Sequence, residues 1–229
     1  MALAIGLLAP SPSHALPPKG TRLTVAASGD FLIHSPVWRR ALAYGGGRRY
    51  EFGPMLRKIA PVIAGADLAL CHLETPLSRG SPRGYPSFRT PAALGDAVRA
   101  AGWDACSTAS NHTLDGGQRG VDTTLDLLER IGLPQTGSYR TEEEARRTTI
   151  LEAKGVKVAF LAYTALTNGQ RAPHPWTLNM ARAPLILRDA KRARLAGADA
   201  VVVNLHWGDE FRAAPTREQR SLADTLTHS

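Results

Sequence analysis

Acidic, amide and imidazole side chains follow several apolar runs of this sequence, at the points where those runs end. Four strand-like runs end in this way: residues 21–28 lead to Asp30, 67–73 to Glu74, 104–109 to Asn111 and His112, and 199–205 to His206 with Glu210. Oxygen and imidazole ligands together suit Mn, Zn, Fe or Mg, and no thiolate is needed. Such a cluster could hold one or two divalent cations and activate water for attack on phosphorus.

Each of these residues also has a plainer interpretation. Asp30 after Gly29 is typical of a turn, and Glu74 before a Thr-Pro pair is equally well explained as a solvated loop acid. Asn111 is an ordinary turn residue, and a single His206 at a strand end is more often a hydrogen-bonded structural histidine. Two further histidines are interpreted as structural: His34 and His174. The recurrence of the pattern at four strand ends is what favours a site.

An α/β fold would bring these ends together. Strands are expected over 21–28, 67–73, 104–109, 148–153, 156–163 and 199–205, and helices over 37–44, 55–64, 91–101, 119–131, 141–146, 184–195 and 215–227. Alternating strands and helices indicate a parallel or mixed sheet, whose strand ends line one edge where ligands bind. Lys154-Gly155 predicts a hairpin, and Thr141 followed by Glu144 three residues on predicts a capped helix start. Residues 78–90 and 165–182 are expected to be irregular.

Composition allows one globular domain and favours anionic partners. The chain has 229 residues, 43% of them hydrophobic, and a formal net charge of +8. This charge favours phosphates, acidic polymers or a membrane surface, although a solvated arginine-rich surface explains it equally well. Arginines in the 78–90 loop could clamp an anionic substrate: Arg79, Arg83 and Arg89. No basic stripe is interleaved with aromatic residues, so nucleic-acid binding is not predicted.

The cysteines and the N-terminus bear on location. Cys71 and Cys106 lie in apolar runs and are expected to be buried thiols, with one bridge as the alternative in an exported protein. Residues 1–19 hold an apolar run and a Ser13-His14-Ala15 segment typical of a cleavage site, but nothing basic precedes Lys19. We expect a leader or clipped signal peptide over 1–19, a single domain over 20–229, and export or cell-surface association, with a cytoplasmic location as the alternative.

Four short motifs occur in a characteristic order. They are Gly29-Asp30, HLETPL at 72–77, SNHTLD at 110–115 and HWGDE at 206–210. Together they resemble the CapA family, which is named for poly-γ-glutamate capsule synthesis and belongs to the calcineurin-like metallophosphoesterase superfamily. The resemblance covers roughly Leu23 to the end of the chain.

The resemblance implies a four-layer α/β/β/α sandwich, incomplete at the C-terminus. It also implies that the metal ligands are Asp30, Glu74, Asn111 and His206, binding divalent Mn, Zn, Fe or Mg. His112 would protonate the leaving group or steady the transition state. His72 stands where many relatives have Asn.

The implied function is capsule synthesis or export, by a protein with a metallophosphoesterase-like metal site. Its partners would be an anionic substrate or polymer and membrane-associated capsule machinery. The alternatives are a metal-dependent phosphoesterase unrelated to capsule and an inactive truncated remnant. The family continues into a further strand and a Gly-His-x-Pro-His motif, which nothing after His206 matches. We therefore expect a fragment of a longer chain rather than a degenerate member.

Overall fold

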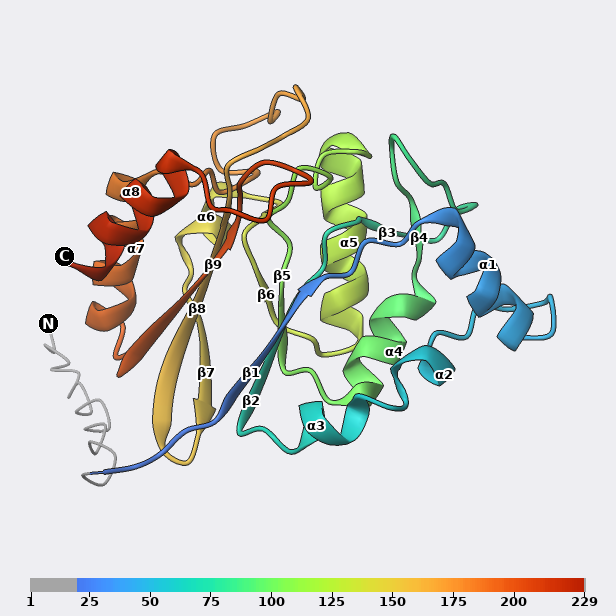
Figure 1. Cartoon of the computed structure of the whole chain (residues 1–229), viewed down its shortest axis with the longest axis horizontal. Helices are drawn as coiled ribbons and strands as arrows, with labels where there is room; N and C mark the ends of the chain where they lie inside the picture. The colour runs from blue at the N-terminus through green and yellow to red at the C-terminus, as the bar shows by residue number, and fades with distance from the viewer. Residues whose placement is uncertain (1–19, 229) are drawn as a thin grey trace, which may run out of the picture.

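Two β-sheets lie face to face, and helices cover the outer face of each (Figure 1). The first sheet is parallel and contains, in spatial order, β1 (Val25–Asp30), β2 (Leu68–His72), β5 (Ala105–Ser107) and β6 (Gln135–Thr136). The second contains β7 (Thr149–Ala153), β8 (Val156–Thr164) and β9 (Ala200–His206). A separate parallel pair joins β3 (Leu77–Ser78) to β4 (Thr90–Pro91). This computed structural model describes residues 20–228, so the leader predicted over 1–19 lies outside the described residues.

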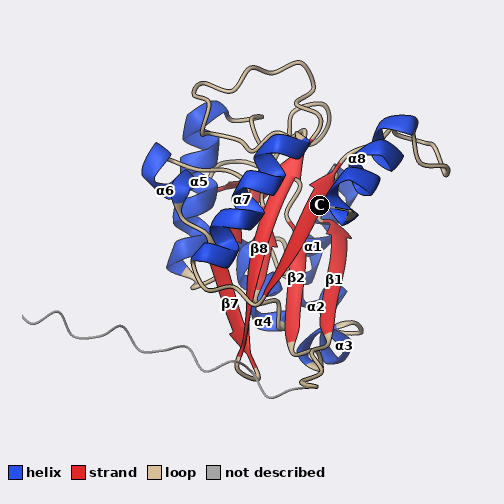
Figure 2. Ribbon diagram, turned by 90° about the vertical axis from the view of Figure 1, so that its left-hand side faces the viewer, coloured by secondary structure: helices blue, strands red, loops and turns tan. Residues whose placement is uncertain are grey.

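The helices divide between the two outer faces. Those beside the first sheet are α1 (Ser35–Tyr44), α2 (Gly53–Leu56), α3 (Ala60–Ala64), α4 (Ala93–Ala101) and α5 (Gly117–Arg130). Those on the second are α7 (Ala183–Leu195) and α8 (Arg217–Thr227), which lie in front of its strands in the turned view of Figure 2. A short helix, α6 (Glu142–Arg146), precedes the second sheet. The predicted α/β/β/α layering is confirmed.

Strand alternation explains these layers, because successive side chains point to opposite faces of a sheet. Leu70 of β2 and Ala105 of β5 pack against Phe160 of β8 between the two sheets. Their neighbours Ala69 and Cys106 point outward into the cluster formed with the helices. In the second sheet, the side chains that point away from the interface between the two sheets pack against Ile186 of α7 and Leu222 of α8; they are Leu161, Tyr163 and Val203.

Two local signals predicted from sequence are confirmed. Lys154 and Gly155 both adopt positive φ angles, 51° and 74°, and connect the antiparallel strands β7 and β8. Such turns match the twist of the strands they join. Thr141 caps α6 by accepting a hydrogen bond from the backbone N–H of Glu144 at 3.2 Å.

The single helix predicted over 55–64 is wrong. The segment forms two short helices, α2 and α3, and Pro61 lies in the first turn of the second. Proline has no N–H to bond to the preceding turn and its ring clashes there, so a helix starts at this residue rather than continuing through it. The helix predicted over 91–101 begins later than expected, because Pro91 lies in β4 and α4 begins at Ala93.

The prediction of buried free thiols is also wrong. Cys71 on β2 and Cys106 on β5 are register partners in adjacent strands, with Cα atoms 4.4 Å apart, and they form a disulfide. Both residues are buried. The pairing depends on the strand order β2-β5 and on the register between them, which the spacing of the cysteines in the sequence does not reveal.

No helix within residues 20–228 combines the length and the apolar character that crossing a bilayer requires.

Candidate metal centre

A β-bulge in β1 places Asp30 beside His72. Ala27 is the partner of Leu70, but the next partners along the two strands are Asp30 and His72, so three steps on β1 match two on β2. A one-residue shift of register reverses the face to which a side chain points. The bulge therefore aligns Asp30 with the inward-facing residues of β2. The sequence interpretation, in which the strand ended before Gly29, is corrected here.

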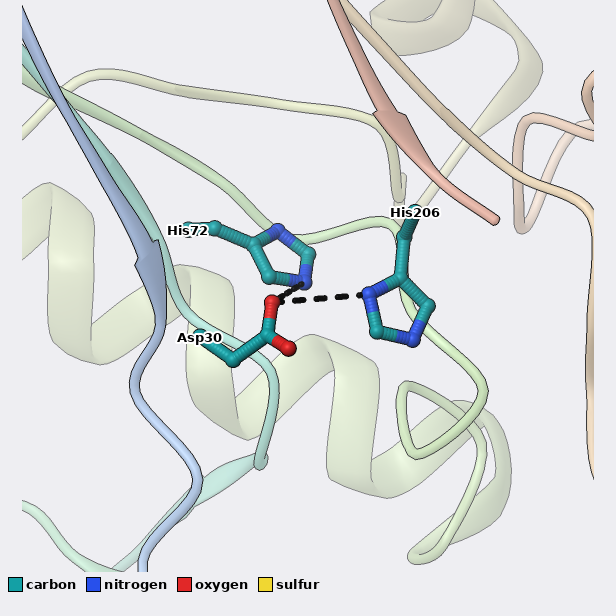
Figure 3. Close-up of side chains that lie close together, drawn as sticks. All are labelled: Asp30, His72 and His206. Atoms are coloured by element: carbon teal, nitrogen blue, oxygen red, sulfur yellow. Dashed lines mark ion pairs between the residues drawn. The ribbon is translucent and has the colours of Figure 1, made fainter. Parts of the chain in front are cut away.

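Asp30, His72 and His206 form a compact group (Figure 3). Asp30 Oδ1 lies 3.6 Å from His72 Nε2 and 3.6 Å from His206 Nδ1, and one ligand atom from each residue lies within 4.8 Å of the others. The two imidazole rings stack with centroids 4.9 Å apart. The group uses the ends of β1, β2 and β9, so it joins the two sheets rather than lying along the edge of one sheet, as first expected.

Each imidazole is held through one nitrogen and directed at the carboxylate through the other. His72 Nδ1 lies 3.0 Å from Ser107 Oγ, and His206 Nε2 lies 3.0 Å from Asn111 Oδ1. Asn111 in turn donates from Nδ2 to Asn168 Oδ1 at 3.3 Å. A polar partner on the second ring nitrogen is what usually orients a metal-binding histidine.

The charges of the group also suit a cation. Burial, followed by the charge of the neighbouring His206, lowers the pKa of His72 to about 4, while Asp30 opposes the shift. A hydrogen bond from His206 lowers the pKa of Asp30, against the opposing effect of partial burial. At neutral pH the group therefore offers a neutral imidazole and an ionised carboxylate, the protonation states that bind metal ions.

Two buried polar atoms lining this region lack a hydrogen bond. Glu74 Oε2 and His72 Nε2 make no hydrogen bond to any residue the structure describes. Burial, followed by the charge of Asp30, raises the pKa of Glu74. Buried polar atoms rarely lack a hydrogen bond, and both of these groups lie close enough to Asp30 to feel its charge, which fits a positive ion. The donor set and these two atoms therefore fit a divalent metal.

Every site residue predicted from sequence lines one cavity of about 500 Å³. Its lining includes Asp30, Glu74, Asn111, His112 and His206. Only Asp30 and His206 belong to the three-residue group, and Asn111 joins it through His206. Among residues 20–228, neither Glu74 nor His112 forms a hydrogen bond with this group, and the role of each stays a prediction.

Asp115 orients His112. His112 Nδ1 lies 2.9 Å from Asp115 Oδ2, which also accepts the backbone N–H of Phe88 at 2.5 Å. Gln170 donates to the other carboxylate oxygen at 2.9 Å. A carboxylate only accepts, so Nδ1 carries the proton and Nε2 is the nitrogen left for the cavity. Asp115 does not cap α5, because the N-cap of that helix is Gly116.

Sequence reasoning missed His72 as a candidate ligand. Its spacing could have identified it, because His72 lies two residues after Leu70 and alternate residues of a strand share one face. Leu70 faces the space between the two sheets, so His72 faces it too. His34 also lines the cavity, with its ring edge-on to Phe88. His174 stacks on Trp176 and is absent from the cavity lining.

Comparison with known proteins agrees with this architecture. The family model described as "Bacterial capsule synthesis protein PGA_cap" matches residues 24–229. The capsule biosynthesis protein CapA of Bacillus anthracis is 27% identical over 216 residues, which is 90% of this chain and 51% of that relative. The PGA biosynthesis protein CapA of Bacillus subtilis (strain 168) is 28% identical over 128 residues, covering 53% of this chain and 32% of the relative.

A third relative is the uncharacterized protein y4uA of Sinorhizobium fredii (strain NBRC 101917 / NGR234), 27% identical over 161 residues. That match covers 66% of this chain and 32% of the relative. The chain spans about half the length of the anthracis protein, and the matches to the other two relatives cover about a third of each. With a family match over nearly its whole length, the chain belongs to the bacterial capsule synthesis protein family PGA_cap.

Proposed function

We propose that this protein acts in making or exporting an anionic capsule polymer of the poly-γ-glutamate type and carries a divalent-metal centre for hydrolysis of a phosphoester or related bond. Family membership and the names of the two Bacillus relatives support the capsule role. The net charge of +8 suits an anionic polymer. The observation that carries the metal centre is that two buried atoms near the charge of Asp30, His72 Nε2 and Glu74 Oε2, have no hydrogen bond within residues 20–228.

The residues proposed to hold the metal are Asp30, His72 and His206, with Glu74 and Asn111 on the same cavity. This set adds His72 to the ligands predicted from sequence. A bound Mn, Zn, Fe or Mg ion would supply positive charge that polarises a phosphoryl group and acidifies water at the site.

The proposed role of His112 is to hold and deliver a proton at Nε2. Asp115 fixes the ring through Nδ1 and stabilises the imidazolium form when Nε2 is protonated. His112 lies on the lining of the cavity, where a leaving-group oxygen would be within its reach. Phe88 packs edge-on against the His112 ring, with centroids 4.6 Å apart, and limits its rotation.

The proposed location is outside the cytoplasm, at the cell surface, in contact with capsule machinery. The disulfide between Cys71 and Cys106 supports this, because structural disulfides persist in oxidising compartments. The leader predicted over residues 1–19 points the same way.

Two assays test the proposal. The protein, stripped with a chelator and then supplied with Mn²⁺, Zn²⁺ or Mg²⁺, should hydrolyse bis-p-nitrophenyl phosphate, and absence of turnover with all three ions would refute the hydrolytic centre. A deletion strain should lose surface polymer and regain it from the wild-type gene but not from an Asp30→Asn gene. An active phosphoesterase in a strain with unchanged polymer would assign the alternative, a phosphoesterase unrelated to capsule.

A further inference from the structure

A second cavity adjoins the first and is lined by arginine. Its volume is about 500 Å³, and Phe88 lies on the lining of both cavities. Four guanidinium side chains contribute to it: Arg79, Arg83, Arg89 and Arg119. The first three come from the loop between β3 and β4, and Arg119 comes from the first turn of α5, where the helix dipole also favours an anion.

These four positive charges are not neutralised by the protein. Across residues 20–228, no carboxylate forms an ion pair with any of them. Two acids line the same cavity, but both are engaged with other groups. Asp115 accepts from His112 and Phe88, and Asp126 pairs with Arg140 at 2.6 Å. The cavity therefore concentrates positive charge that has no internal counter-ion.

The loop backbone forces two of the arginines together. Arg83 and Arg89 exchange both backbone hydrogen bonds, at 3.0 and 2.9 Å, as an antiparallel bridge. Directly opposed residues in such a bridge project to the same face, and like charges there destabilise the pair. An anion between the two side chains would turn this repulsion into attraction.

The arginine loop is fixed relative to the metal-centre cavity. Phe88 is 3% exposed, and its backbone N–H bonds the same Asp115 oxygen that holds His112. Ser87 also donates to the backbone carbonyl of Asp115. One carboxylate therefore positions both the proposed proton donor and the arginine loop.

We propose that the second cavity is a subsite for a further anionic group of an extended polyanion whose reacting group lies at the metal centre. The inference rests on the proposed function, because it takes the first cavity as the reaction site. The planar fork of a guanidinium binds carboxylate or phosphate oxygens through two parallel hydrogen bonds. A polymer with an anionic group on every unit would engage both cavities, which a single small anion would not do.

The test is binding of defined oligoanions by calorimetry, with a γ-linked glutamate hexamer and tripolyphosphate as probes. We expect the Arg83→Gln/Arg89→Gln variant to bind at least one probe about tenfold more weakly, equivalent to about 1.4 kcal/mol. The second cavity variant, Arg79→Gln/Arg119→Gln, should also bind at least one probe about tenfold more weakly. It keeps the test valid if the first variant does not fold. Arg57→Gln/Arg194→Gln, two exposed arginines outside the cavity, makes the same change in charge and should bind as wild type. Free glutamate, which carries too few anionic groups to reach both cavities, should show the same affinity for every variant and for the wild type.

The probe whose affinity falls identifies the anion as carboxylate or phosphate, and a fall with either supports the subsite. Equal affinity of both cavity variants, the control variant and the wild type for both probes would overturn it. The proposed function is tested separately, by hydrolysis of bis-p-nitrophenyl phosphate by the wild-type protein. A protein without that activity whose arginine variants still lose oligoanion binding would refute the hydrolytic centre and keep the subsite.

Discussion

At the scale of single residues, the candidate site separates metal binding from proton transfer. His72 and His206 each have one ring nitrogen held by a neighbour and the other directed at Asp30. His112 lies on the same cavity but is held by Asp115 and makes no ion pair with that group among the described residues. Substitutions at the two places should therefore have different consequences.

Replacing His112 with Asn should lower turnover of bis-p-nitrophenyl phosphate by about 10²- to 10⁴-fold, the usual contribution of a positioned general acid. Metal content should stay at the wild-type level, because His112 is not in the ligand group. His174→Asn is the matched control, since His174 stacks on Trp176 and does not line the cavity. Unchanged turnover in His112→Asn would show that the residue has no role in proton transfer.

The low pKa of His72 predicts how the stability of the metal-free protein depends on pH. The folded-state pKa is about 4 and the unfolded value is 6.5, so between these values the unfolded chain binds more protons. Stability therefore falls as pH is lowered from 6.5 towards 4, by up to about 3 kcal/mol. Denaturant titrations in chelator should show this slope in the wild type, and the slope should be smaller in His72→Asn. Equal slopes for the two proteins would contradict the burial argument.

At the scale of elements, the bulge in β1 decides whether Asp30 can belong to the site. Its register with β2 shifts between Ala27 and Asp30, and without the shift Gly29 would occupy the place beside His72. β1 is an edge strand of the first sheet, so it can carry the extra residue without disturbing a second neighbour.

Deleting both Ser28 and Gly29 should remove the bulge and pair Asp30 with Cys71, on the outer face of the sheet and away from His72. We expect the variant to keep a wild-type far-ultraviolet circular dichroism spectrum while its affinity for Mn²⁺ or Zn²⁺ falls at least about tenfold, as expected when a ligand is lost. A folded deletion variant that binds metal as tightly as the wild type would show that the bulge does not position Asp30.

Elements with a local cause were predictable from sequence, and those with a distant cause were not. The Lys154-Gly155 hairpin and the Thr141 cap depend on residues a few positions apart, and both are confirmed. The break before α3 was also local, since Pro61 marks it, but the apolar pattern over 55–64 concealed it. The bulge in β1 depends on pairing with β2, some forty residues away in the chain.

The same distinction holds for the site. Asp30, Asn111 and His206 could be proposed because each ends an apolar run, and the structure places all three on one cavity. His72 lies inside such a run, and only the stacking of the two sheets shows that its side chain meets His206. The role of Asp115 likewise depends on His112 and the arginine loop coming together in space.

At the scale of the whole molecule, the candidate centre lies where the two sheets meet. β1 and β2 contribute from one sheet and β9 from the other, so the ligands depend on how the sheets stack. Asn204 of β9 also donates to Ser107 of β5 at 3.1 Å, a direct bond across this seam. Stability of the first sheet should therefore matter to the site.

The disulfide between β2 and β5 should contribute to that stability. It closes a loop with a sequence separation of 35 residues. The loop-entropy relation gives about 4 kcal/mol at 25 °C for a loop of this length. Urea unfolding of Cys71→Ala/Cys106→Ala should show a free energy of unfolding lower by about that amount. The same midpoint in variant and wild type would indicate that the cross-link contributes nothing.

Whether Asp30, His72 and His206 bind a divalent metal can be measured by titration calorimetry of chelator-stripped protein with Mn²⁺ and Zn²⁺. We expect saturable binding by the wild type and by His174→Asn, with affinity at least about tenfold lower in Asp30→Asn and in His72→Asn. Wild-type protein that binds neither ion, or variants that bind as tightly as the wild type, would contradict the proposed metal centre.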